Sequence, residues 1–189
     1  MDSQNLCSLN KVIGLKGETG ESKFNYITVD ENLEGEGNLI FSTGTIPDRL
    51  VTLDGNGNIN KDTGYITTEK PLYSQWKLIP LYIAQLTEID NEATKGNNIK
   101  KIKAANIDEL VNQLLVQKYD WRKDSRQEIK DGIIKLQKLL DGGVTEFIIY
   151  TQETNNKIIS FNSNQGDAGY RIYSPLGKTG FSLKGKCKE

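Results

Sequence analysis

Hydrophobic side chains recur at three- and four-residue spacing in the middle of the chain. The apolar members of the first such run are Ile107, Leu110, Val111, Leu114, Leu115 and Tyr119. This spacing places apolar side chains on one face of a helix, and Asn106 with Glu109 forms a capping-box-like start. The pattern therefore predicts a helix near residues 107–119.

A second three–four repeat follows after a short connection. Its apolar members are Ile129, Ile133, Leu136, Leu139 and Leu140. Glu128 stands three residues after Ser125, as in a helix start, and Asp141-Gly142-Gly143 supplies a stop because glycine accepts the left-handed cap. We expect a second helix near 126–140 and, because residues 120–124 connect the two closely, an αα-hairpin.

Short runs of β-branched and aromatic residues lie on both sides of the helical region. The runs are 24–28, 38–43, 49–53 and 65–68 before it, and 144–150, 157–161, 170–173 and 180–183 after it. The first group predicts a small β-meander. In the second group, Asn155-Asn156 reads as a turn, which predicts antiparallel hairpins toward the C-terminus.

Residues 72–86 are harder to assign, because they contain Tyr73, Trp76 and Tyr82 with Pro80 inside the run. Proline disrupts a helix interior, so we expect a strand here. The predicted class is α+β, with strands at the ends and helices between them. The expected divisions are an extended docking arm at 1–22, a β-meander at 23–68 and an α+β body at 69–189.

Asp54-Gly55-Asn56-Gly57-Asn58 separates two of the predicted strands and also resembles part of a calcium loop. In that register Thr52 and Thr63 occupy the first and last ligand positions, where a calcium loop has carboxylates. Asp-Gly and Asn-Gly favour the positive φ of a tight hairpin. We therefore interpret the segment as a hairpin turn, with weak calcium binding as the alternative.

Composition narrows the possible chemistry. The chain of 189 residues has a formal net charge of −1, which disfavours nucleic acid as a partner, and it contains no histidine. The commonest general base and metal ligand are therefore missing. The two cysteines, Cys7 and Cys187, are expected to be free thiols, with a disulfide between them as the alternative.

Other site motifs are incomplete. Gly177-Lys178-Thr179 suggests a phosphate-binding loop, but Ile172 stands where the first glycine belongs, so we expect a turn. We expect no cofactor, no metal and no enzymatic activity. The N-terminus lacks a signal-peptide pattern and no apolar run approaches the length of a membrane helix, so neither export nor membrane binding is expected.

A glycine stands at every third position from Gly14 through Gly17 to Gly20. These Gly-X-Y triplets precede the hairpin phrase that runs from Arg49 to Ile59. Together the two stretches resemble fibre, tail and head-accessory proteins of tailed bacteriophages, over about residues 14–68. The resemblance implies a non-enzymatic virion component, present in the host cytoplasm during synthesis, that assembles with copies of itself and with other virion proteins.

Two sets of residues are candidates for contacts within such an assembly. The triplet glycines Gly14, Gly17 and Gly20 and the helix residues Leu114 and Leu115 are predicted at a partner interface, since the first helix is apolar over a wide arc. The alternative function is a carbohydrate- or receptor-binding module that uses Trp76 and Trp121. An enzyme with a carboxylate mechanism ranks third.

Overall fold

The computed structural model describes residues 12–13, 29–69, 79–114, 120–153, 155–176 and 181–187. The chain forms two compact units, one from residues 1–70 and 151–189 and the other from 71–150. Strands build the first unit and helices dominate the second, so the predicted α+β class is confirmed. The division differs from the expected one, because the chain after residue 150 rejoins the first unit.

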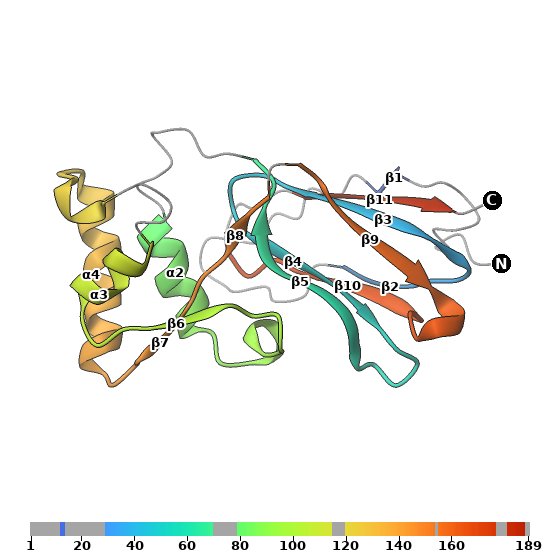
Figure 1. Ribbon diagram of the computed structural model, residues 1–189, viewed down its shortest axis with the longest axis horizontal. Coiled ribbons are helices and arrows are strands. Elements are labelled where there is room, and N and C mark those ends of the chain that lie inside the picture. Colours follow the sequence, from blue (N-terminus) through green and yellow to red (C-terminus); the bar gives the residue numbers. More distant parts are fainter. Residues whose placement is uncertain are drawn as a thin grey trace. The chain divides into compact units, whose positions relative to one another are not determined.

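The first unit contains two sheets (Figure 1). Sheet A has the order β1-β11-β3-β9, with β1 at Val12–Ile13, β11 at Phe181–Cys187, β3 at Glu36–Thr43 and β9 at Lys157–Asn162. All neighbours in it are antiparallel. The short 3₁₀-helix η5, Ser163–Gln165, follows β9 directly.

Sheet B has the order β2-β10-β4-β5-β8. Its strands are β2 at Val29–Asn32, β10 at Gly169–Tyr173, β4 at Asp48–Leu53, β5 at Ile59–Thr67 and β8 at Thr151–Gln152. Only β8 is parallel to its neighbour among these described strands. The predicted hairpin turn at 54–58 joins β4 to β5 and is confirmed.

One apolar core joins the two sheets into a sandwich. Sheet A contributes Leu39, Phe41, Phe161, Phe181 and Leu183, and sheet B contributes Leu50, Ile66, Tyr170 and Ile172. Successive side chains of a strand point to opposite faces, so these residues define the inner face of each sheet. The residues between them in sequence lie on the outer faces.

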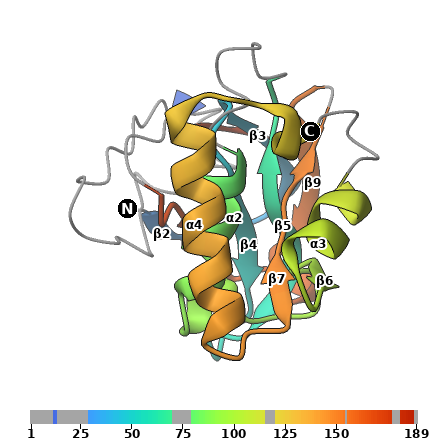
Figure 2. The ribbon, with the colours of Figure 1, turned by 90° about the vertical axis from the view of Figure 1, so that its left-hand side faces the viewer.

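The second unit packs three helices against a two-stranded ribbon. The helices are α2 at Ile79–Glu88, α3 at Ile107–Leu114 and α4 at Gln127–Asp141, and the ribbon is β6 at Lys101–Lys103 with β7 at Glu146–Ile148. Two 3₁₀-helices, η2 at Glu92–Thr94 and η4 at Trp121–Lys123, complete its described part. Figure 2 shows α4 lying beside α2, which is its main helical contact.

Both predicted helices are present. α3 covers 107–114, while 115–119 lie outside the described residues, and α4 begins one residue after the predicted start. The Asn106 side chain accepts the N–H of Glu109 at 2.9 Å, and the Glu109 carboxylate accepts the N–H of Ala105 at 2.7 Å. This reciprocal capping supports the sequence interpretation.

The strand expected within 72–86 is wrong over its described part, because α2 begins at Ile79. Pro80 is the second residue of that helix. A proline in the first turn removes an N–H that has no partner within the helix, so it does not break it there. The predicted αα-hairpin also misses that α4 packs chiefly against α2.

Apart from the β4–β5 hairpin, the predicted strand pairings are wrong, although most of the strands exist. β7 pairs with β6 and β9 pairs with β3, so the turn at Asn155-Asn156 joins no hairpin. β3 leaves the predicted meander for sheet A, and β10 and β11 lie in different sheets. Strand partners are chosen by side-chain fit across long sequence separations, which local alternation does not encode.

Candidate functional site

A polar groove with a volume of about 370 Å³ opens on the first unit. It is lined by Glu36, Gly37, Asn38, Lys61, Ser160, Phe161, Asn162, Gln165 and Lys186. Most of these residues come from β3, β9 and β11 of sheet A, with Lys61 from β5 and Gln165 from η5. Side chains from four strands and a short helix therefore converge on one place.

The register of sheet A explains why polar side chains gather there. Lys186, Asn38 and Ser160 are directly opposite one another on β11, β3 and β9, and Glu36 is opposite Asn162. Gly37 and Phe161 alternate with them along the strands, and the Phe161 side chain points into the core. Two adjacent cross-strand rows on the outer face are thus wholly polar.

The next row toward the middle of the sheet has a different character. Lys184, Ile40 and Ile158 are opposite one another on β11, β3 and β9. Ile158 is 60% exposed, the largest fraction of any large hydrophobic residue in the described part of the chain. An apolar shelf made by Ile40 and Ile158 therefore borders the polar rows.

Asp167 lies behind the groove and holds two of its lining residues, Lys61 and Asn162. It is fully buried, and its carboxylate accepts hydrogen bonds from Thr52 Oγ1 at 2.6 Å, Asn60 Nδ2 at 2.7 Å and the Asn162 N–H at 2.9 Å. Burial alone would raise the pKa of Asp167, but these hydrogen bonds and one from Lys61 outweigh it and lower the pKa. The Asp167 side chain is therefore an ionised carboxylate fixed in place by its hydrogen bonds.

Lys61 is the group that Asp167 positions. Its Nζ donates to Asp167 Oδ2 at 2.9 Å and to the Ser160 carbonyl at 2.6 Å. An ammonium group has three N–H donors, so one remains for a ligand. The anchoring links β5 of sheet B to β9 of sheet A beside the groove.

A second feature is the outer edge of sheet A. β11 pairs with β3 along all its residues, from Phe181 to Cys187. On its other side Val12 pairs with Lys184 and Ile13 with Leu183, and no further partner is present within the described ranges. A two-residue segment directly before the glycine triplets thus already adds to this edge as a strand.

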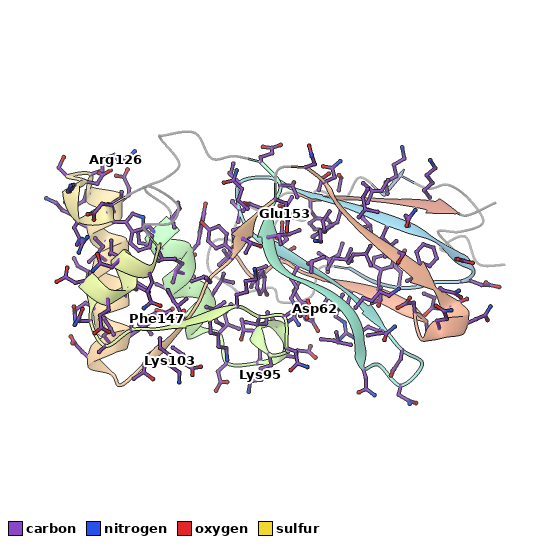
Figure 3. The ribbon with its side chains drawn as sticks, in the orientation of Figure 1. Asp62, Lys95, Lys103, Arg126, Phe147 and Glu153 are labelled. Carbon is purple, nitrogen blue, oxygen red and sulfur yellow. The ribbon has the colours of Figure 1, made fainter. Side chains whose placement is uncertain are left out.

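A buried charge cluster lies on the outer face of sheet B. Arg49 is fully buried and its guanidinium contacts Asp62 at 2.5 Å (Asp62 is labelled in Figure 3). The Arg49 guanidinium also lies 5.3 Å from the centroid of the Tyr173 ring, and that of Arg171 lies 5.9 Å from it. These contacts satisfy the charges internally, so the cluster stabilises the sheet instead of presenting a site.

The candidate residues predicted from sequence fall in two groups. Trp121 is 3% exposed and Leu114 is 5% exposed, and both belong to the apolar core of the second unit. The expectations of an exposed aromatic contact at Trp121 and a partner contact at Leu114 are therefore corrected, because both side chains already pack internally. Gly14, Gly17, Gly20, Leu115 and Trp76 lie outside the described residues, as do Cys7 and the segment 177–179.

The turn at 54–58 is held by its own first residue. Asp54 Oδ1 accepts the N–H groups of Asn56 and Asn58, each at 2.9 Å, which lowers the pKa of Asp54. Gly57 has a φ of 82°, which glycine adopts without strain. Across the described ranges, no three His, Cys, Asp or Glu side chains gather in a way that could hold a metal ion.

Sequence reasoning missed the groove because its parts are remote from one another. Lys61 and Asp167 are 106 residues apart, and Asn38 and Ser160 meet only through strand register. The available signal was the alternation of Glu36, Asn38 and Ile40, which places them on one face. No local motif names their partners.

Comparison of the chain with protein-family models, with curated proteins and with solved structures found no match. Among the helices of the described residues, none has the length and apolarity needed to cross a membrane. Function must therefore be argued from the chain's own features.

Proposed function

We propose that this chain is a non-enzymatic structural component of a tailed-bacteriophage particle, of the fibre, tail or head-accessory type. It assembles with copies of itself and with other virion proteins, and it passes from the host cytoplasm into the virion. The Gly-X-Y run and the hairpin phrase of residues 49–59 support this proposal from the sequence.

The observation that carries the proposal is the pairing of β1 with β11. Val12 and Ile13 directly precede the glycine triplets and add to the edge of a sheet whose remaining strands begin at Glu36, Lys157 and Phe181. Adding a strand to an exposed edge is a common way for one protein to bind another, since main-chain hydrogen bonds supply the affinity.

The same pairing can be made between two copies. Residues 14–28 connect β1 to β2, and a chain of that length spans up to roughly 50 Å when extended. That reach allows β1 of one copy to occupy the β11 edge of the next, as in domain swapping. Repeated head-to-tail, the exchange links copies without any new contact surface.

Cross-linking between two single-cysteine proteins tests this exchange. In a background with Cys7→Ser and Cys187→Ser, one protein carries Val12→Cys and the other Lys184→Cys. The two positions are directly opposite in the register, where Cα atoms lie about 4.5–5.5 Å apart, within the range of roughly 4.4–6.8 Å that a disulfide spans. We expect a heterodimer on a non-reducing gel after mixing and mild oxidation.

The matched control replaces Lys184→Cys by Ser182→Cys, two positions along β11 on the same face, which is too far for a bond to residue 12. If a disulfide forms in a single protein that carries both Val12→Cys and Lys184→Cys, but not between the two single-cysteine proteins, β1 stays within its own copy. That result would reject exchange.

Truncation tests the wider proposal. Removing residues 1–22 deletes β1 but none of the sandwich core residues that the structure describes. We expect a folded protein by circular dichroism that no longer assembles by light scattering or cosediments with virions on a gradient. Normal assembly of the truncated protein would contradict the proposal.

A further inference from the structure

Four side chains of the groove have unused hydrogen-bonding capacity. Asn38, Gln165 and Lys186, together with the Ser160 hydroxyl, make no side-chain hydrogen bond to another described residue. The anchored ammonium of Lys61 adds one further donor. Two amides and a hydroxyl offer acceptors beside these donors, so the groove can both donate to and accept from a ligand.

The charges of the groove balance. Lys61 and Lys186 are its cations, Glu36 is its carboxylate, and Lys61 is also paired with the buried Asp167 beside the groove. A phosphate or sulfate ligand would need a surplus of positive charge, and a metal ion would need a cluster of carboxylates. Neither condition holds, so the site suits an uncharged polar ligand.

The shelf beside the polar rows adds an apolar requirement. Ile40 and Ile158 occupy the row next to Lys186, Asn38 and Ser160, and Ile158 is largely exposed. A ligand that covers both rows has hydroxyl groups on one side and a C–H surface on the other. Pyranose rings have this distribution, and burying the shelf adds a favourable apolar contribution.

We propose that the groove is a binding site for a neutral carbohydrate of one or two sugar residues. The volume of about 370 Å³ lies within the range of about 300–1,000 Å³ typical of small-molecule sites. Asn38 and Ser160 bind hydroxyl groups, Lys61 donates its remaining N–H, and the Ile40–Ile158 shelf contacts the C–H face. Trp121 belongs to the core of the other unit, and the site does not depend on assembly.

The first experiment uses the full chain labelled with ¹⁵N and a panel of neutral disaccharides: maltose, lactose, cellobiose and N,N′-diacetylchitobiose. We expect at least one to shift the backbone amides of residues 36–38 and 160–162 saturably at millimolar concentration. Glucuronic acid and inorganic phosphate are the charged comparisons, and they should shift these amides less.

Variants locate the interaction. Asn38→Ala removes one hydrogen-bonding side chain and should weaken the binding sugar about fivefold, which is the fold-change for about 1 kcal/mol. Ser42→Ala is the matched control, since Ser42 lies on the same strand and face but outside the groove lining. Its affinity should be unchanged, and the amide spectra of both variants report whether the fold is intact.

Three results would overturn the inference. The first is that no sugar of the panel shifts the groove amides saturably and that a glycan array gives no selective hit. The second is that phosphate or glucuronate binds more tightly than the neutral sugars. The third is that Asn38→Ala binds the sugar with the same affinity as the wild type. Because the readout is residue-specific, it is independent of whether the protein assembles.

Discussion

The two units differ in how far apart in sequence their contacting segments are. In the sandwich, β3 is held between β9 and β11, and β4 pairs with β10, so most contacts join segments more than a hundred residues apart. In the helical unit, α3 and η4 are capped by residues next to them, Asn106 and Asp120. Local patterns therefore define α3 and α4 of the helical unit, whereas they do not define the strand partners of the sandwich.

The units also treat charge differently. The sandwich buries Arg49, Asp48 and Asp167 completely. The core of the helical unit is apolar, and Arg122 pairs at its surface with Asp108 at 3.1 Å. Surface pairs contribute little, whereas buried groups cost several kcal/mol when a partner is removed. Polar substitutions should therefore damage the sandwich more.

Asp167→Ala tests this contrast most severely. It leaves the donors of Thr52, Asn60 and Asn162 without their shared acceptor, and we expect a loss of about 3–5 kcal/mol from the sandwich. Hydrogen exchange measured by peptide should accelerate in β3, β4 and β10 and change little in α4. Lys61→Ala removes only one of four donors and should cost less. Equal acceleration in both units would show that they unfold together.

The same carboxylate gives the sandwich a pH dependence. The pKa of Asp167 is lowered in the folded state, so its contribution is present above the unfolded pKa of about 3.9 and is lost as pH falls through the folded pKa. Urea unfolding followed by circular dichroism should show wild-type stability falling below about pH 4. Asp167→Asn should flatten that fall, and an unchanged slope would contradict the assignment.

Leu136→Ala is the counterpart in the helical unit. Leu136 is fully buried in its core, and truncation should cost about 2–5 kcal/mol through lost transfer energy and the cavity left behind. Trp121 is buried in this core, so tryptophan fluorescence reports its unfolding. Ile134→Ala, at a half-exposed position of the same helix, is the control and should change little.

Gly132→Ala probes the contact between α4 and α2. A Cβ atom there would lie 2.9 Å from Pro80 Cβ and 3.0 Å from the Leu81 nitrogen. Alanine normally favours a helix by about 1 kcal/mol, but the clash should reverse the sign and leave a net loss of about 1–2 kcal/mol. Gly142→Ala, whose nearest neighbour would be the Lys138 carbonyl oxygen at 3.4 Å, is the control. Stabilisation by Gly132→Ala would mean the helices are farther apart.

Asn106→Ala should have the smallest effect. It removes the acceptor for the Glu109 N–H and should cost about 1 kcal/mol, confined to the first turn of α3. Amide exchange of that turn is the measurement, and Asn106→Asp, which keeps the acceptor, should restore protection. If Asn106→Ala also lowered amide protection in the sandwich, the effect of this cap would not be local, contrary to the prediction.

The sequence was informative where structure is decided locally. The helices at 107–114 and 127–141 followed from apolar spacing, and the turn at 54–58 followed from Asp-Gly and Asn-Gly. The Asn106 cap of α3 was also predicted correctly, whereas α4 begins after Arg126 without the side-chain cap expected from Ser125. Pro80 misled, because its effect depends on its position within the helix, which the flanking residues did not reveal. Strand existence was also readable, but strand partners were not, since register depends on the whole sheet.

The groove shows the same limit more strongly. Alternation could place Glu36 and Asn38 on one face of β3, yet nothing near them indicates that Ser160 and Lys186 stand opposite. Lys61 looks like any surface lysine until Asp167 is found beside it. Trp121 suggested a ligand contact by residue type alone, but its side chain is buried in the core of the second unit.

The parallel pairing of β5 with β8 has a consequence for synthesis. The chain leaves sheet B after Thr67 and returns beside it at Gln152, so the whole helical unit is made between two neighbouring strands. On the ribosome that unit is complete before β9, β10 and β11 exist. Until these strands are translated, β3 and β4 have edges without hydrogen-bonding partners. Such edges promote aggregation of nascent chains. Slowing translation across residues 71–150 should therefore lower the yield of soluble protein, with the sandwich half as the vulnerable intermediate.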